Sequence, residues 1–260
     1  MQDSFWNTVR EIPHRKELMQ PEPMKYIDMQ TDGRILTVWL NNPPNNYLPG
    51  QFFVEMDRCR KEHMVSDQID AVIISARGRT FSKGADINEI KSGLGQIDLE
   101  TIRFGNDVFT ALSRLNKPVI AAVNGPCFGG GLELALCCHL RVCSEKAMFG
   151  LPEVTAGVIP GLGGIPRLIE TIGHAKALEM VLLGDIIPAS QALQLNLVSR
   201  VFEKAAFWKK TLLFVKTILS ARKEAVRHTI EMFDLCRIDH HQQAIEESAK
   251  RFSQLISTLG

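Results

Sequence analysis

The stretch Asn124-Gly125-Pro126-Cys127-Phe128-Gly129-Gly130-Gly131-Leu132-Glu133 separates an apolar run at residues 118–123 from another at residues 134–138. The first run predicts a buried strand, and the second predicts a helix. Three consecutive glycines at a strand-to-helix junction let another molecule approach the main chain closely, because no side chain blocks it. Backbone N–H groups beside the carboxylate of Glu133 are the groups needed to stabilise an oxyanion and to move a proton.

Strands and helices alternate on both sides of this stretch. The expected strands are residues 34–40, 71–75, 118–123, 140–143 and 147–149, and the expected helices of this part are residues 52–64 and 102–115. The short apolar run at residues 71–75 is typical of a parallel strand that is buried on both faces. The recurring strand-then-helix order predicts a layered α/β core up to about residue 150.

The chain beyond Pro160 changes character. Helices are expected at residues 165–172, 175–183, 190–195, 221–235 and 240–259, and only residues 197–202 suggest another strand among them. Prolines interrupt any long helix within the first 23 residues. We therefore expect an N-terminal extension at residues 1–23, an α/β core at 24–200, and a helical C-terminal region at 201–260. The helical region is expected to pack on the core or on another subunit.

Composition limits the classes of partner and the location. The chain has 260 residues, of which 45% are hydrophobic, and its formal net charge is +1, so neither nucleic acid nor an anionic membrane surface is expected as the main partner. No apolar run approaches the roughly 18 to 20 residues that span a bilayer, and the N-terminus resembles neither a secretory signal nor a presequence. Six cysteines without a Cys-x-x-Cys pair are typical of reduced thiols, so a cytoplasmic location is expected.

Three segments carry the groups suited to chemistry. They are Arg79-Thr80-Phe81-Ser82-Lys83-Gly84-Ala85-Asp86-Ile87, the glycine run, and residues 149–164, which include Glu153. The first two follow strands and are therefore expected at strand carboxyl ends, where ligands of α/β proteins bind. Taken singly, each signal has an ordinary structural explanation: Glu133 as a helix-end charge, Glu153 as a turn carboxylate, and Asp86 as a helix cap. The glycine pattern matches no dinucleotide or nucleoside triphosphate motif.

Taken together, these segments resemble the crotonase superfamily, the enoyl-CoA hydratase and isomerase family. The resemblance is strongest in residues 81–87, in residues 122–133, and in Phe149-Gly150-Leu151-Pro152-Glu153 with Ile159-Pro160-Gly161-Leu162-Gly163-Gly164. It implies an α/β crotonase fold, a ClpP-like spiral of ββα units with a helical C-terminal region that mediates trimerisation. It also implies a homotrimer or a dimer of trimers.

The resemblance further implies a role for each site residue. The backbone N–H groups of Lys83 and Gly130 form an oxyanion hole for a thioester carbonyl. Glu133 orients a water molecule and accepts its proton, and Glu153 exchanges the proton at Cα. Further substrate contacts are implied for Ser82, Gly84, Ala85, Asp86, Ile87, Gly129, Pro152 and Gly161.

The presence of both glutamates favours a hydratase, because isomerases of this family typically keep only the position of Glu153 or use acids elsewhere. The implied substrate is a 2-enoyl thioester of coenzyme A in fatty acid metabolism, with the coenzyme A entering as part of the substrate and no separate cofactor or metal. An isomerase, another thioester lyase or hydrolase acting on coenzyme A or a carrier protein, and a non-catalytic scaffold are the alternatives.

Departures from the family pattern leave two further questions. Lys83 is larger than the alanine often found there, and its side chain either reaches a phosphate of coenzyme A or lies in solvent. Asn46 matches an asparagine of the family, but Tyr47 is bulkier than the usual alanine.

The cluster Cys137-Cys138-His139 is not expected to bind metal, because adjacent residues of a helix point in different directions.

Overall fold

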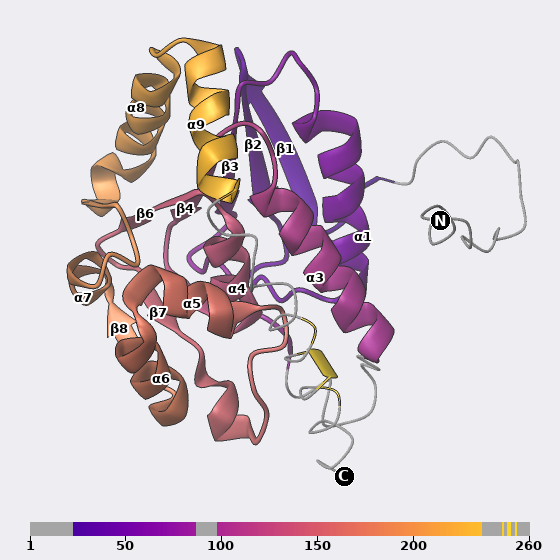
Figure 1. Cartoon of the computed structure of the whole chain (residues 1–260), viewed down its shortest axis with the longest axis vertical. Helices are drawn as coiled ribbons and strands as arrows, with labels where there is room; N and C mark the ends of the chain where they lie inside the picture. The colour runs from indigo at the N-terminus through magenta and orange to yellow at the C-terminus, as the bar shows by residue number, and fades with distance from the viewer. Residues whose placement is uncertain (1–22, 87–97, 236–245, 247–248, 251–252, 254–260) are drawn as a thin grey trace, which may run out of the picture.

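A six-stranded sheet forms the centre of the protein (Figure 1). The computed structural model describes residues 23–86, 98–235, 246, 249, 250 and 253. Along the sheet the strands are β1 (Ile27–Asp32), β2 (Ile35–Leu40), β3 (Ala71–Ala76), β4 (Val119–Val123), β6 (Leu140–Ser144) and β9 (Arg200–Phe202). β1 pairs antiparallel with β2, and every other neighbouring pair is parallel. The carboxyl ends of β2, β3, β4, β6 and β9 therefore lie at one edge.

Helices cover both faces of this sheet. The helices are α1 (Gly50–Cys59), α3 (Leu99–Ser113), α4 (Gly130–Cys137), α8 (Phe207–Leu219) and α9 (Lys223–Leu235). Alternate strand residues such as Val38 and Ile74 belong to a large core with side chains of α1, α3 and α4. Their neighbours such as Ile73 pack instead with Phe207 and Val215 of α8. Two-sided burial is the reason that β3 and β4 are continuous apolar runs.

A second, small sheet lies beside the carboxyl ends of the first. Its strands are β5 (Pro126–Phe128), β7 (Met148–Gly150) and β8 (Ile186–Pro188), in that order. The helices that follow β7 in the chain are α5 (Gly164–Ile172), α6 (His174–Leu183) and α7 (Ala189–Gln194), and η2 (Pro152–Ala156) is a short 3-10 helix. An isolated bridge joins Ser82 to Cys127 of β5. The loop after β3 and the glycine run after β4 are thereby held side by side.

Most predicted elements are confirmed, and the differences have physical reasons. The expected helix at residues 52–64 is α1, which continues into a π turn, η1 (Arg60–Met64). β1 is missed because its solvent-facing residues are polar, as expected of a strand at a sheet edge. β5 and β8 are three residues long and contain proline, which is a poor strand signal.

The glycine run itself begins the helix, ahead of the apolar segment at residues 134–138 that predicted it. α4 starts at Gly130, and all of its residues are buried. Tertiary packing has therefore outweighed the low helix propensity of glycine. The carboxylate of Glu133 lies in the first turn, next to the N-terminus of the helix.

The predicted division of the chain stays a prediction. Residues 1–22 and most of the expected helix at 240–259 lie outside the described residues. The predicted boundary at residue 200 falls in β9, which pairs with β6, so the core sheet includes residues 200–202. Among the described residues, no helix is both long enough and apolar enough to span a membrane.

Candidate active site

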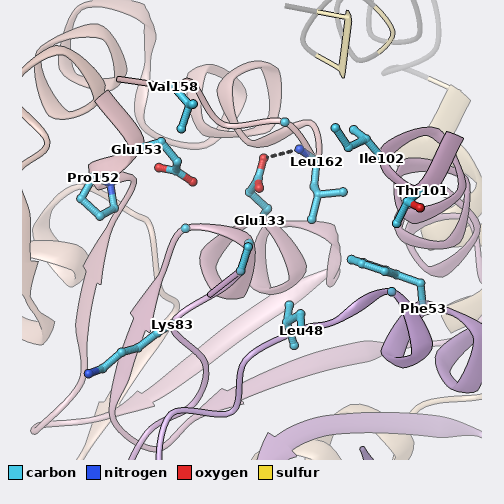
Figure 2. Close-up of a pocket in the computed structure, with 15 residues that line it drawn as sticks. Leu48, Phe53, Lys83, Thr101, Ile102, Glu133, Pro152, Glu153, Val158 and Leu162 are labelled. Atoms are coloured by element: carbon cyan, nitrogen blue, oxygen red, sulfur yellow. Dashed lines mark hydrogen bonds between the residues drawn. The ribbon is translucent and has the colours of Figure 1, made fainter. Parts of the chain in front are cut away.

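A cavity lies at the carboxyl ends of β3 and β4 (Figure 2). It is bounded by the loop after β3, the start of α4, η2, the loop before α5, and the facing parts of α1 and α3. Its lining residues are Leu48, Gly50, Phe53, Lys83, Ala85, Thr101, Ile102, Gly129, Gly130, Glu133, Pro152, Glu153, Val158, Gly161 and Leu162. Most of these side chains are apolar, and two carboxylates point into the space between them.

Glu133 is fixed by the loop that precedes α5. Its Oε1 accepts hydrogen bonds from the backbone N–H groups of Leu162 and Gly164, each at 2.8 Å. The side chain is buried. A β-carbon on Gly164 would lie 2.8 Å from Cγ of Glu133, so only glycine allows this close approach. Two N–H donors favour the ionised form of the carboxylate that accepts them.

Glu153 comes from η2 and faces Glu133 across the cavity (Figure 2). It is buried, and among the described residues its Oε2 has no hydrogen-bond partner. Its Oε1 lies close to Gly129, where an added β-carbon would approach it to 3.1 Å. One edge of this carboxyl group is therefore left available inside the cavity.

The two carboxyl groups have different proton affinities. Burial raises the pKa of Glu133 to about 7, and the hydrogen bonds from Gly164 and Leu162 and the charge of Arg167 oppose that rise. Burial, followed by the negative charge of Glu133, raises the pKa of Glu153 well above its ordinary value. Glu153 is therefore the member that holds a proton, and Glu133 is the member that ionises. Such a division between neighbouring carboxyl groups is the arrangement that acid–base chemistry needs.

Ala85 and Gly130, which line the cavity, supply two backbone N–H groups to the site. The main chain at Gly84 passes very close to Gly130, since a β-carbon on Gly84 would lie 2.5 Å from the nitrogen of Gly130. Gly84 also has a φ of +77°, a conformation that favours glycine. Among the described residues, no acceptor is recorded for the N–H of Ala85 or of Gly130. Free N–H donors at adjacent points of two loops can stabilise a negative oxygen between them.

The comparison with known proteins agrees with this geometry. The sequence profile of the family described as enoyl-CoA hydratase/isomerase matches residues 30–259. A short-chain-enoyl-CoA hydratase of Clostridium acetobutylicum is 33% identical over 241 residues, which are 88% of this chain and 89% of that relative. This chain belongs to the enoyl-CoA hydratase/isomerase family.

Solved structures and longer relatives extend the comparison. The crystal structure of an enoyl-CoA hydratase from Mycobacterium avium subsp. paratuberculosis K-10 superposes with a TM-score of 0.82 at 26% identity, covering 90% of this chain and 95% of that one. The predicted crotonase fold is therefore confirmed. The fatty acid oxidation complex subunit alpha of Idiomarina loihiensis is 39% identical over 180 residues, 67% of this chain but 25% of that longer relative.

The structure contradicts one role that the family resemblance implies. The N–H of Lys83, predicted as an oxyanion donor, donates to the carbonyl of Asn45 at 3.0 Å. Its side chain is exposed and points away from the two carboxylates (Figure 2). Ala85, predicted only as a substrate contact, has the free N–H instead. The sequence signal that could have distinguished them is the glycine between them, whose φ of +77° changes the course of the chain after Lys83.

The other predicted substrate contacts divide into two groups. Ala85, Gly129, Pro152 and Gly161 line the cavity, whereas Ser82 and Gly84 lie behind it. Ser82 donates its hydroxyl to the carbonyl of Asn46 and accepts from the N–H of Gly84, so it shapes the loop. Asp86 is half-buried outside the lining, and Ile87 lies outside the described residues.

Several residues of the site gave no signal in the sequence. The cavity is also lined by Leu48, Phe53, Thr101, Ile102 and Val158. Most of these are apolar, and from the sequence alone an apolar residue in a helix or loop is assigned to the hydrophobic core. Arg167 and Asn106 contact the loop that holds Glu133, and a single arginine or asparagine in a helix reads as surface. Within the described residues, no cluster of three potential metal ligands occurs.

Proposed function

We propose that this protein is an enoyl-CoA hydratase, which adds water across the Cα=Cβ bond of a 2-enoyl-CoA thioester. The observation that carries the proposal is the convergence of two buried carboxyl groups with unequal proton affinities on one cavity that also has two free N–H donors. The names of the relatives and the family assignment support the same reaction. A scaffold that had lost catalysis would not need two carboxyl groups buried side by side, one of them with an oxygen that has no partner among the described residues.

The thioester carbonyl is the electron acceptor of the reaction. Its oxygen would lie between the N–H groups of Ala85 and Gly130, which polarise the C=O bond and make Cβ electrophilic. As the water oxygen bonds to Cβ, the π electrons move toward the carbonyl, and the enolate oxygen gains negative charge beside these donors. Removal of one such donor typically costs about 2.7–4 kcal/mol of barrier.

The two glutamates manage the proton transfers. Glu133, held in place by the N–H groups of Leu162 and Gly164, accepts a proton from the attacking water. Glu153, which keeps its proton because it is buried beside Glu133, delivers it to Cα and completes the addition. The proton taken up by Glu133 replaces the one that Glu153 gives, so the pair returns to its starting charge once that proton redistributes. No electrons enter or leave, so we propose that no redox cofactor or metal is needed.

The apolar walls suit an acyl chain. Leu162, Phe53 and Ile102 lie together on one side of the carboxylates with Leu48 below them, and Val158 lies apart from them, near Glu153 (Figure 2). Burial of an aliphatic chain against such walls contributes about 0.8 kcal/mol for each methylene group. A straight-chain 2-enoyl group of fatty acid metabolism is the substrate class that we propose, and the coenzyme A part enters with it.

Absorbance of the conjugated thioester provides the test. Crotonyl-CoA and longer 2-enoyl-CoAs are incubated with the protein, and loss of the conjugated chromophore is followed. Hydration with at least one of them is the expected result. Conversion of 3-enoyl-CoA to the conjugated isomer, without hydration of any 2-enoyl-CoA, would instead assign an isomerase. No reaction with either series would leave the scaffold alternative.

We also propose a homotrimer or a dimer of trimers in the cytoplasm. Leu182 and Leu183 of α6 and Ile186 of β8 are 61%, 63% and 44% exposed, which gives one face of this region an apolar surface. The five cysteines within the described residues form no disulfide and are buried, as is typical of a reducing compartment. Light scattering of the purified protein tests the assembly.

A further inference from the structure

The loop at residues 161–164 is held from its outer side by two buried polar side chains. Arg167, in the first turn of α5, donates from Nη1 to the carbonyls of Leu162 at 2.9 Å and Gly163 at 3.2 Å. Asn106 of α3 donates from Nδ2 to the carbonyl of Gly161 at 2.9 Å. The backbone carbonyls of three consecutive residues, 161 to 163, therefore all accept hydrogen bonds from side chains of α3 and α5.

The opposite side of the same loop holds Glu133. When the carbonyls of residues 161–163 point toward Arg167 and Asn106, the N–H groups of Leu162 and Gly164 are free to point inward, where Oε1 of Glu133 accepts both. Peptide planes are rigid, so the direction of a carbonyl fixes the direction of the following N–H. The outer contacts thus determine the geometry of the inner ones.

Neither side chain is explained by stability alone. Arg167 is 3% exposed, and within the described residues it has no ion pair with a carboxylate; its third recorded contact is to Oγ1 of Thr110 at 3.3 Å. A buried charge without a paired countercharge is costly. Asn106 is 4% exposed, and among the described residues its Oδ1 has no hydrogen-bond partner, which an apolar side chain would avoid.

The charge of Arg167 acts on the carboxyl pair. Its field favours the ionised form of Glu133. Among the described residues that line the cavity, Glu153 of η2 is the other carboxyl group facing Glu133, and its ionised form would oppose that effect. α1 and α3 present Phe53, Thr101 and Ile102 to the cavity, and the exposed Lys83 points away, so none of these supplies a compensating charge (Figure 2).

We propose that Arg167 and Asn106 are positioning residues for Glu133. Together they orient the loop at residues 161–164 so that its N–H groups hold the carboxylate of Glu133, and Arg167 also brings a positive charge to the outer side of this loop. This role rests on the proposed hydratase function for its purpose, but the titration of Glu133 in the free protein does not depend on that function.

Carbon NMR of the full-length protein labelled at the glutamate carboxyl carbon tests the proposal without any substrate. The signal of Glu133 is assigned by its loss in Glu133→Gln. In Arg167→Met, which removes the charge and the clamp, the midpoint of this titration should move upward by about one pH unit. In Arg167→Lys, which keeps the charge, the midpoint should stay closer to that of the unchanged protein.

Asn106→Leu tests the clamp separately from the charge. Loss of the donor to Gly161 should loosen the N–H groups that favour the carboxylate, so the midpoint of Glu133 should rise although no charge has been removed. With an enoyl-CoA substrate, kcat should fall about tenfold with little change in KM, because the loop positions a catalytic group.

Arg141→Met is the matched control. Arg141 also donates to backbone carbonyls, those of Leu197 at 2.8 Å, Ala135 at 3.3 Å and Cys138 at 2.8 Å, but at the far end of α4. This variant should lower the melting temperature and leave the titration of Glu133 in place.

An unchanged midpoint in a folded Arg167→Met would overturn the charge role, and an unchanged midpoint and kcat in Asn106→Leu would overturn the clamp. If circular dichroism shows that Arg167→Met does not fold, the titration midpoints of Glu133 in Arg167→Lys and Asn106→Leu are used instead. A rise in Asn106→Leu supports the clamp, and an unchanged midpoint there contradicts it. The charge role is then tested by Arg167→Gln, whose midpoint should lie above that of Arg167→Lys, and equal midpoints in these two variants would contradict it. A normal set of titrations without hydration would reject the hydratase function alone.

Discussion

The two ends of the same parallel strands differ in whether their charged groups are paired with an opposite charge. At the carboxyl ends of β3 and β4, the carboxyl groups of Glu133 and Glu153 are buried together, and the pKa of each is raised. At the amino ends, Arg34 precedes β2, Asp70 precedes β3, and the charges are paired. The comparison separates groups that stabilise the fold from groups that are kept for chemistry.

At the amino ends, Asp70 and Lys117 both have partners. Asp70 is paired with both Arg34 and Lys223, and these partners lower its pKa to about 2. Lys117, just before β4, donates from Nζ to the carbonyls of Ser66 and Ile69, each at 2.8 Å. The carboxyl ends instead retain an unpaired oxygen on Glu153, a cost that evolution normally removes unless the group is used.

The largest contrast is expected from Glu133→Gln. The amide keeps the shape but cannot accept a proton from water, so kcat for enoyl-CoA hydration should fall about 10³-fold, or about 4 kcal/mol of barrier. Steady-state kinetics with crotonyl-CoA measures the change. A variant with the rate of the unchanged protein would show that Glu133 is not the base.

Two glycines, one at each end, give a matched pair. Gly84→Ala places a β-carbon 2.5 Å from the nitrogen of Gly130, at a φ of +77°, so it should displace the oxyanion donors and lower kcat/KM about 10²-fold. Gly33→Ala, in the β1–β2 turn, has a similar φ of +58° but meets nothing within 4 Å. It should cost about 1 kcal/mol of stability and leave catalysis intact.

Equal losses of activity in Gly84→Ala and Gly33→Ala would mean that backbone strain, and not the closeness of Gly84 to Gly130, controls the site. Thermal melting of both variants separates the cost in stability from the cost in catalysis.

Lys117→Met tests the amino end. Removal of the ammonium takes away the Lys117 donor to the buried carbonyl of Ile69 and one of two donors to the carbonyl of Ser66, so the free energy of unfolding should fall by about 3 kcal/mol. Urea denaturation measures this loss, and kcat of the protein that remains folded should not change. A loss of kcat without a loss of stability would contradict the division between the two ends.

The contribution of Glu153 to the free energy of unfolding should depend on pH. The folded-state pKa of Glu153 is raised, so the folded protein binds this proton more tightly than the unfolded chain does. Its contribution is therefore fully present below the unfolded-state pKa, close to 4.5, and is lost at about 1.4 kcal/mol per pH unit as the pH rises toward the folded-state pKa. Glu153→Gln should flatten this loss, which urea denaturation at pH 4 to 8 measures.

The smallest effect is expected from Asp70→Asn. Its partners Arg34 and Lys223 are about half exposed, so loss of the two ion pairs should cost about 1 kcal/mol or less. The folded-state pKa of Asp70 is lowered, so this stability is present above its unfolded-state pKa of 3.8 and is lost as the pH falls toward about 2. Melting curves in 1 M NaCl should show a smaller difference between the two proteins. A difference that grows with salt would exclude an ionic origin.

The sequence alone determined the order of the elements and the identity of the two carboxylates. Apolar runs at residues 71–75 and 118–123 predicted the buried strands, because burial on both faces demands a continuous apolar segment. The glycine run, Glu133 and Glu153 identified the family through their order along the chain. These features are local, so they can be read one segment at a time.

Only the tertiary structure decided which groups act together. The N–H of Lys83 is occupied by Asn45 while that of Ala85 is free, and this difference depends on a loop distant in the sequence. Asn106 contacts the loop that holds Glu133 across 55 residues of sequence, and this loop meets Glu133 only because α5 packs beside α4. The direction of a hydrogen bond and the burial of a charge are set by long-range packing, and no local pattern encodes them.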